Sequence, residues 1–520
     1  MLVAFQVPSD VRSLSRSSTS RTSWFGSAAC LLCIACGAPT PLDDSKRPAG
    51  PVGGFDNAPL AAAGGKGGTG VPGGSGDNPT GLVSQSGTGA TDVAGSGVAL
   101  GCKGLQCQQH ACPRGGTTVS GRVYDPAAKN PLYNIAVYIP NEAVGQLSLG
   151  ASCASCDSLY TGKAVTSTLT DAEGKFTLKD APDGTNIPLV IQIGKWRKQL
   201  TIPVVTACQD TPMPDKMLTL PRNQMEGDIP NMAISTGAAD TLECLLRRIG
   251  LDASEYVGGP AGTGRIHIFQ GSPGRGSGAI GTPMQAPNTS PAAPLSPTAL
   301  WNSAAELMKY DIVLLSCEGQ ETVNMNQQAL HDYASAGGRV FASHFHYAWF
   351  NTGPYGAENL ATWTTGSQDI GNIGANIVTT FPKGMALAQW LQSNNALVNG
   401  ELPIEMARHN ADVASANTPS QAWITADQFA RSRGATQYFS FNTPTDAASK
   451  ADGPGYCGRV VFSDLHVGAA SHDMPAMPVP TSCADVDLSP QEKALEFMLF
   501  DLSSCVIPDN KPPLPPPVLN

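Results

Sequence analysis

Residues 310–318 read YDIVLLSCE, residues 333–346 read YASAGGRVFASHFH and residues 457–466 read CGRVVFSDLH. Each stretch contains a short, continuous apolar run that ends in a polar cluster. Runs without polar alternation are typical of strands that are buried on both faces, as in a parallel sheet covered by helices. The middle stretch also follows a helical pattern that stops at Gly337 and Gly338, a common way to end a helix. Together the three stretches predict an α/β fold.

The alternation of strands and helices extends over residues 229–505. Further helical patterns occupy residues 240–249, 300–310 and 383–393, and further β-rich runs lie near residues 232–235, 265–269, 377–379 and 437–441. The last helix begins at Ser489, where Pro490 and Glu492 complete a capping box. This order predicts an open, flavodoxin-like α/β sheet with helices on both faces, and a surface loop inserted at residues 271–298. We exclude a TIM barrel, because eight regular strand–helix units are not recognisable.

The polar clusters that end these strands are the best candidates for a functional site. In a parallel sheet the carboxyl ends of the strands meet at one edge, where open α/β folds bind ligands. If the chain stays extended after residue 343, two of the histidines point to the same side. Imidazoles and carboxylates in such a cluster either ligate a divalent metal or act as acid and base. The alternative is that these residues at the strand ends make only local hydrogen bonds. The candidate residues are Glu318, His344, His346, Asp464 and His466.

The same stretches resemble the class I glutamine amidotransferase-like fold, and within it the trehalose-utilisation-type (ThuA-like) proteins. An amidotransferase of this class carries its nucleophilic cysteine on the turn that follows the Gly-Gly strand. Here residues 343–345 read Ser-His-Phe, so the resemblance implies no cysteine-based glutaminase. The ThuA-like relationship points to carbohydrate without fixing a reaction.

A different pattern precedes this region, at residues 117–221. Residues 119–125 read VSGRVYD and residues 168–178 read TLTDAEGKFTL, which are strands and turns of alternating polarity. Short strands at close spacing predict an antiparallel β-sandwich. The motifs at 119–125, 170–176 and 182–184 resemble the carboxypeptidase regulatory-like domain, which has a transthyretin-like fold. This family implies an accessory module that binds carbohydrate or a partner. Trp196 is either a binding residue at an exposed tip or a residue that packs over the sandwich.

Six cysteines surround the predicted sandwich: Cys102, Cys107, Cys112, Cys153, Cys156 and Cys208. The spacing of Cys153 and Cys156 is also that of half a zinc site, but further ligands are scarce, so we expect disulfides. The sequence does not choose among their possible pairings. We expect the Cys-rich junction at residues 102–116 to be tied to the sandwich by these bonds.

The first 36 residues predict export. Arg12, Arg16 and Arg21 precede a short apolar stretch that ends at Cys36, as in a secretory signal. The end of this stretch resembles a bacterial lipoprotein signal, which implies that Cys36 is lipidated; simple cleavage of the signal is the alternative. A Gly-rich, disordered tether is predicted at residues 37–101, and a Pro-rich tail at 506–520.

The composition agrees with an exported, multidomain chain. The 520 residues include 56 glycines, 42 prolines and 14 cysteines, and only 14% are charged. Many cysteines are typical of oxidising compartments. The net charge of −10 and the lack of a basic cluster argue against binding to nucleic acid. If Cys30 and Cys33 leave with the signal and Cys36 is lipidated, an odd number remains, and Cys317 is the expected free thiol.

The sequence therefore predicts a protein of the cell envelope or the extracellular space, anchored in a membrane by lipid. We expect a binding or scaffold function, related to carbohydrate or to another envelope protein. The alternative is a metal-dependent hydrolase acting on a surface glycan or a related small molecule, with a divalent metal as its cofactor.

Overall fold

The computed structural model describes residues 101–153, 155–271, 285, 287, 296–322, 326–426, 435–447, 455–468, 472–474 and 477–519. All of them belong to one compact unit. The predicted signal with Cys36, all of the predicted tether except its last residue, and most of the predicted loop at 271–298 lie outside the described residues. None of the described helices is long and apolar enough to cross a membrane.

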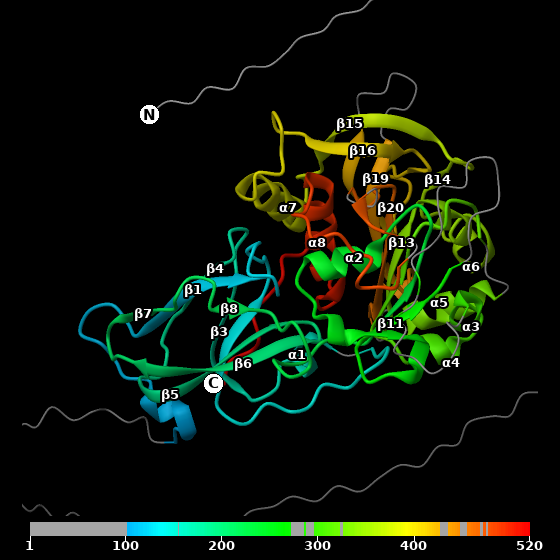
Figure 1. The fold of residues 1–520 in the computed structure, drawn as a ribbon. Helices are drawn as coiled ribbons and strands as arrows, with labels where there is room; N and C mark the ends of the chain where they lie inside the picture. The colour runs from blue at the N-terminus through cyan, green and yellow to red at the C-terminus, as the bar shows by residue number, and fades with distance from the viewer. Residues whose placement is uncertain are drawn as a thin grey trace, which may run out of the picture. The chain divides into compact units, whose positions relative to one another are not determined.

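The N-terminal part of the described chain consists mainly of two four-stranded sheets (Figure 1). One sheet is antiparallel throughout, in the order β3 (Ala164–Leu169), β2 (Ala136–Pro140), β5 (Gly184–Ile193) and β6 (Trp196–Val205). The other contains β4 (Lys175–Leu178), β1 (Thr118–Tyr124), β7 (Asp210–Pro212) and β8 (Leu218–Thr219). Apolar side chains of both sheets lie in one core cluster. The short helices η1 (Gly104–Gln108) and α1 (Cys156–Leu159) complete this part.

The predicted turn between β3 and β4 is formed by Asp171 and Gly174. The carboxylate of Asp171 accepts hydrogen bonds from the backbone of Glu173 and Lys175, both at 2.9 Å. Gly174 has φ +71°, and a Cβ there would lie 2.8 Å from the carbonyl oxygen of Val123. Glycine is therefore required where this turn packs against the end of β1.

The C-terminal part is built on a mixed sheet of twelve strands. Six neighbouring strands are parallel: β10 (Tyr256–Gly258), β11 (Ile266–Phe269), β9 (Met232–Ser235), β12 (Ile312–Leu315), β13 (Arg339–Ser343) and β20 (Gly458–Ser463). Antiparallel strands continue it: β19 (Ala435–Thr443), β18 (Ser420–Ala426), β15 (Asp369–Ile377) and β16 (Leu402–Arg408), with β14 (Thr362–Trp363) and β17 (Ala411–Asp412) at the side. The sheet is open, as predicted. The β-rich runs expected near residues 377–379 and 437–441 fall at the end of β15 and within β19, but their antiparallel pairing and the strands β16 and β18 were not predicted.

Helices cover both faces of the parallel half. Successive residues of a strand point to opposite faces of the sheet, so an apolar strand places apolar side chains on both faces. Ile312 and Leu314 of β12 pack in one apolar cluster and Val313 and Leu315 in another. The first face is covered by α2 (Leu242–Arg248) and α8 (Pro490–Ser503), with α7 (Pro382–Ser393) packed beside α8 and against β15 of the antiparallel half. The second face is covered by α3 (Pro297–Trp301), α4 (Ala304–Leu307), α5 (Gln327–Ser335) and α6 (Gly353–Gly356). The short 3₁₀ helices are η2 (Ala253–Glu255), η3 (Gly259–Ala261) and η4 (His344–Trp349).

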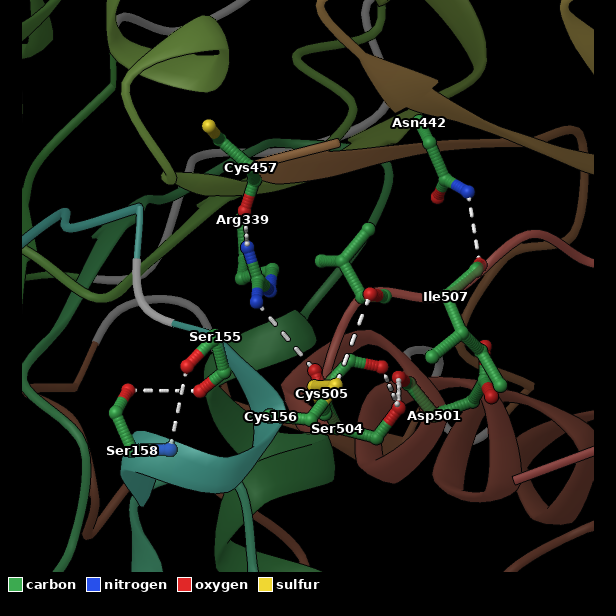
Figure 2. Close-up of a disulfide and its surroundings, with 11 residues drawn as sticks. Ser155, Cys156, Ser158, Arg339, Asn442, Cys457, Asp501, Ser504, Cys505 and Ile507 are labelled. Carbon is green, nitrogen blue, oxygen red and sulfur yellow. Dashed lines mark hydrogen bonds between the residues drawn. A yellow bond between two sulfur atoms is a disulfide. The ribbon is translucent and has the colours of Figure 1, made fainter. Parts of the chain in front are cut away.

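The two parts share a core and are cross-linked. The apolar cluster on the α8 face continues into the core of the N-terminal sheets. Disulfide Cys153–Cys457 joins residues that are 304 positions apart in the sequence, and Cys156–Cys505 joins residues that are 349 positions apart (the latter is shown in Figure 2). The other disulfides are Cys102–Cys107, Cys112–Cys208 and Cys244–Cys483.

All six cysteines predicted to form disulfides do so. The zinc alternative for Cys153 and Cys156 is wrong, because the two thiols bond to different partners in the C-terminal part. We expected these bonds to tie the Cys-rich junction to the sandwich, but those of Cys153 and Cys156 instead join the N-terminal part to the C-terminal part. Among the described cysteines Cys317 alone is free, as predicted, and it is buried.

The Pro-rich tail lies along β3, the edge strand of the antiparallel N-terminal sheet. Val518 pairs with Ala164 of β3 in a parallel bridge, and the backbone nitrogen of Leu519 donates to the carbonyl of Ala164 at 2.9 Å. The hydroxyl of Ser167 donates to the carbonyl of Pro516. The tail therefore covers part of a strand edge that would otherwise be open.

Candidate functional site

The carboxyl ends of three neighbouring strands bring the predicted polar clusters together. β12, β13 and β20 are adjacent and parallel, and their registers align Ile312 with Arg339 and Ser343 with Ser463. The clusters at 317–318, 344–346 and 464–466 follow these strands directly. They therefore lie at one edge of the sheet, as the sequence predicts.

Cys317, His344 and His466 form the centre of this site. The Sγ atom of Cys317 lies 3.3 Å from Nδ1 of His344, and the rings of His344 and His466 are 5.1 Å apart between centroids. One ligand atom from each of the three residues lies within 4.8 Å of the others. All three side chains are buried, with at most 3% of their surface exposed.

The imidazole of His344 is oriented by a hydrogen bond on its far side. Its Nε2 lies 3.1 Å from the carbonyl oxygen of Ser367. Since a carbonyl only accepts, Nε2 carries the proton, and Nδ1 presents a lone pair toward Cys317. His344 also has φ +40°, which is rare for a large side chain. Strain of this kind gathers at functional sites, where the surroundings hold the residue in place.

His466 has an unsatisfied ring nitrogen. Its Nδ1 is buried and has no hydrogen-bond partner. Its carbonyl accepts a hydrogen bond from Nε2 of Gln491 at 2.9 Å, which fixes the backbone. A buried imidazole nitrogen without a partner is costly, and a bound metal would satisfy it.

Asp240, which the sequence analysis missed, fastens the loops that carry both histidines. Its carboxylate accepts from the hydroxyl of Ser343 at 2.6 Å and from the backbone nitrogen of Val467 at 2.9 Å. It thus ties the end of β13 to the segment that follows β20. Asp240 follows β9, another strand of the parallel half, so its position at the same edge was the available signal.

Burial determines the protonation of the central residues. It raises the pKa of the Cys317 thiol to about 12 and lowers the pKa of His466 to about 3. The pKa of His344 is also well below its usual value, because of burial and then the nearby His466. Without a metal, the group is therefore a neutral thiol and two neutral imidazoles.

The other predicted site residues do not join this group of ligand atoms. His346 lies in η4, because the chain turns at His344 instead of staying extended. Its Nδ1 donates to the carbonyl of Ser343 at 3.1 Å, and its ring packs against Trp301 and Trp349. The expectation that both histidines point to the same side is therefore wrong.

The two predicted carboxylates have other surroundings. Asp464 accepts from the backbone nitrogen of Asn410 at 2.8 Å, and burial raises its pKa to about 8. Glu318 is buried, and burial raises its pKa to about 7. A Cβ built on Gly271 would lie 3.3 Å from its Oε1, so this carboxyl points toward the chain that follows β11.

Trp196 is fully buried in the structure. Its ring packs against Phe500 with centroids 5.7 Å apart, and its Nε1 donates to the hydroxyl of Ser503 at 3.3 Å. The expectation of an exposed tip is therefore wrong at this residue, and the packing alternative holds. Trp196 joins β6 to α8, that is, the N-terminal part to the C-terminal part.

The donor set of the central group fits zinc or a similar transition metal. One thiolate and two imidazoles are typical zinc ligands, whereas magnesium and calcium prefer oxygen. Ligand bonds of about 2.0–2.3 Å in a tetrahedron place two ligand atoms roughly 3.3–3.6 Å apart. The 3.3 Å between Cys317 Sγ and His344 Nδ1 is at the short end of this spacing, and the three ligand atoms lie within 4.8 Å of one another, so tetrahedral binding needs small side-chain movements.

No protein-family model and no curated protein matches the chain. Among solved structures, two type II cohesin–X–dockerin complexes from Acetivibrio cellulolyticus, interface mutants, match at 21% and 19% identity. The matches cover 20% and 26% of this chain and 57% and 86% of those chains, with TM-scores of 0.13 and 0.16. A 9R-lipoxygenase from Cyanothece PCC8801 matches at 16% identity over 21% of this chain and 17% of that chain, with a TM-score of 0.10. At such TM-scores these likenesses carry no conclusion about fold or function.

Proposed function

We propose that the protein is a metal-binding protein of the cell envelope, in which Cys317, His344 and His466 hold one divalent ion of the zinc class. The orientation of His344 carries this proposal. Its Nε2 donates to the carbonyl of Ser367, and its Nδ1 lies 3.3 Å from the Cys317 sulfur. Histidine ligands of metals are typically fixed in this way, by a hydrogen bond from the other ring nitrogen.

The neutral state of the group supports metal binding. Neutral imidazoles need not lose a proton before they bind a metal, and only the thiol does. A divalent cation supplies the charge that stabilises a thiolate in a buried place. Without a metal the three residues would make one weak S–H···N hydrogen bond and leave His466 Nδ1 unsatisfied.

The test is metal analysis of the purified full chain, followed by cobalt substitution. We expect about one zinc-class ion per chain and, with Co²⁺, an absorption band from sulfur-to-cobalt charge transfer. Cys317→Ser should abolish the band, and His466→Ala should weaken binding strongly. His331→Ala, which changes a histidine on α5 away from the site, should leave both unchanged. A chain that takes up neither zinc nor cobalt would refute the site.

The predicted location belongs to the same proposal. Five disulfides suit an oxidising compartment, and a lipid on Cys36 would hold the protein at a membrane. Cell fractionation of Cys36→Ser is the test. The variant should leave the membrane fraction, and a variant that stays there would contradict the anchor.

We also propose that residues 117–221 are a carboxypeptidase regulatory-like module for carbohydrate or an envelope partner, and that residues 229–505 are related to the ThuA-like branch. The turn at Asp171 and Gly174 and the parallel strands at the quoted motifs support these relationships. Because the two parts share a core and two disulfides, a glycan array should be probed with the full chain. Absence of binding would remove the carbohydrate role.

A metal-dependent hydrolase is the second candidate. Three protein ligands leave a fourth position for water, as in catalytic zinc sites. Zinc-loaded protein should then cleave chromogenic esters or glycosides, and His344→Ala should lose that activity. If the loaded protein binds zinc but cleaves neither p-nitrophenyl acetate nor p-nitrophenyl glycosides, the binding function remains and the hydrolase does not.

A further inference from the structure

A small cavity lies between the two parts of the molecule, at the opposite edge of the sheet from the cysteine–histidine group. Its volume is about 40 Å³. One wall comes from the amino ends of β12 and β13, and the other from the chain near Ser152 and Lys195. Gly337 allows the walls to approach, since a Cβ there would lie 2.2 Å from the carbonyl of Ser152.

Arg339 lines this cavity, and no carboxylate of the described residues forms an ion pair with it. Its guanidinium donates to the backbone carbonyl of Gly337 at 2.9 Å, and to those of Cys457 at 2.8 Å and Ser504 at 3.4 Å, the two contacts shown in Figure 2. Its Nε is buried without any partner. Burial lowers the pKa of this guanidinium to about 10. Three carbonyl contacts therefore hold the positive charge without neutralising it.

Arg339 is half-buried, whereas Arg248 and Arg459 are buried and paired with carboxylates. Arg248 pairs with Asp473 at 3.0 Å and with Glu492 at 2.9 Å. Arg459 pairs with Asp501 at 3.1 Å and with Asp509 at 2.7 Å. Arg339 differs from them, because its half-buried guanidinium borders the cavity and donates to backbone carbonyls instead of carboxylates.

The remaining lining groups also offer donors. Ser152 Oγ is buried and has no partner. Lys195 donates to the carbonyl of Gly150 at 2.8 Å and to Asp311 at 2.5 Å, which leaves one of its three N–H groups. Both oxygens of Asp311 are used, because the second accepts from the backbone of Asn231 at 2.6 Å. With Lys195 paired to Asp311, the lining keeps one net positive charge and unused donors.

We propose that this cavity binds a small oxyanion, held by Arg339, Ser152 and Lys195. A ligand that only accepts hydrogen bonds matches the unused donors, and its negative charge offsets the guanidinium. The volume admits a carboxylate group or a small tetrahedral anion, since one water needs roughly 10–15 Å³ of such space. This site is separate from the metal site and does not depend on it.

Calorimetric titration of the full, disulfide-bonded chain tests the site. The probes are sodium acetate, sulfate and phosphate, each against sodium chloride of equal ionic strength. We expect saturable binding of at least one oxyanion, and the probe that binds distinguishes a planar carboxylate from a tetrahedral anion. Arg339→Gln should abolish saturable binding. Ser152→Ala should weaken it about fivefold, through the loss of one hydrogen bond.

Arg222→Gln is the matched control, because Arg222 is exposed and pairs only with Glu226. This control should bind like the wild type. If Arg339→Gln does not unfold cooperatively, Ser152→Ala decides the question. No saturable binding of any of the three oxyanions, or equal binding by wild type and Ser152→Ala, would overturn the proposal and leave water in the cavity. Sulfate also stabilises folded proteins without binding to a site. This effect is the same in all variants, so comparison of the variants removes it.

Discussion

At the scale of single residues, Asp240 makes a prediction that separates positioning from metal ligation. It accepts hydrogen bonds from Ser343, Val467 and Thr241, yet contributes no ligand. Asp240→Ala should lower the free energy of unfolding by about 2–4 kcal/mol and weaken zinc binding about 10–100-fold. Urea unfolding and competition with a chelator measure the two effects. Asp487→Ala, which loses only an exposed ion pair with Lys129, should change neither. Unchanged zinc affinity in Asp240→Ala would show that the loops keep their positions without it.

The same scale shows what the sequence can predict at this site. Cys317, His344 and His466 directly follow apolar runs, so their place at one edge followed from strand polarity alone. His346 was misplaced because one residue, His344, adopts a positive φ and starts a 3₁₀ helix. Asp240 was missed because its role depends on the approach of two loops that are distant in sequence. The direction of a side chain beyond the end of a strand depends on such contacts, and the hydrophobic periodicity of the sequence does not predict it.

At the scale of elements, helix α8 joins the two parts through a pair of buried carboxyl groups. Glu496 of α8 and Asp125, which follows β1, interact through their carboxyl groups: Asp125 Oδ2 and Glu496 Oε1 are buried without another partner, and Asn130 donates to Glu496 Oε2 at 2.7 Å. Burial raises the pKa of Asp125 to about 6, and burial and then Asp125 raise the pKa of Glu496 well above its usual value. Lys129 and Lys493 are the nearby positive charges that oppose these shifts. The folded state therefore retains a proton that the unfolded chain releases.

The sign of the pH dependence follows from the raised pKa values. The stabilisation by the pair is complete below about pH 4 and is lost as the pH rises through about 6. Between pH 5 and 8 the wild type should lose about 1–3 kcal/mol relative to Glu496→Gln, in which the amide can donate to an ionised Asp125. Urea unfolding of both proteins across this range is the measurement, with the exposed Glu405→Gln as control. Parallel curves for wild type and Glu496→Gln would contradict a shared proton.

The first turn of α8 provides a second prediction for this element. Ser489 accepts from the backbone of Glu492, whose side chain accepts from the backbone of Ser489. This capping box was predicted from the sequence and is confirmed, because all its contacts are local. Ser489→Ala should lower the free energy of unfolding, measured by urea unfolding, by about 1 kcal/mol. Ser489→Asp should lower it little. A larger loss for Ser489→Asp than for Ser489→Ala would show that the added charge disturbs the buried pair of Glu492 with Arg248.

The antiparallel half of the large sheet shows the limit of the sequence for elements. The parallel strands β9, β11 and β12 are fully buried and mainly apolar, with Ser235 and His267 as the polar exceptions, so each was recognisable. β18 has the burial of a half-covered strand, and β19 is buried although it contains Thr436, Gln437 and Ser440. The run at residues 437–441 within β19 was recognised, but its antiparallel pairing was not, because the partners of its polar residues come from elsewhere in the fold. Nε2 of Gln437, for example, donates to the carbonyl of Arg408 at 2.7 Å.

At the scale of the whole molecule, the disulfides bear on whether the two parts unfold separately or together as one unit. The sequence identified the disulfide-bonded cysteines near the sandwich but not their partners, since pairing depends on the folded arrangement. Cys153 and Cys156 turn out to hold the C-terminal part at two points, and α8 shares the core of the N-terminal sheets. We therefore expect a single cooperative transition for residues 101–519 in calorimetry. Two separate transitions with intact disulfides would contradict a shared core.

The contribution of each cross-link should follow the length of the loop that it closes. With Cys153–Cys457 intact, Cys156–Cys505 closes an effective loop of roughly 50 residues, worth about 4 kcal/mol of chain entropy. Cys102–Cys107 closes a loop between cysteines only 5 positions apart, worth about 2 kcal/mol. The double replacement Cys156→Ala with Cys505→Ala should thus destabilise more than Cys102→Ala with Cys107→Ala, measured by guanidinium unfolding. Removal of both long cross-links should cost more than twice the loss of one, because the second closes a loop of about 300 residues once the first is absent. If the long cross-links together cost no more than the short one, the shared core and not the disulfides holds the two parts together.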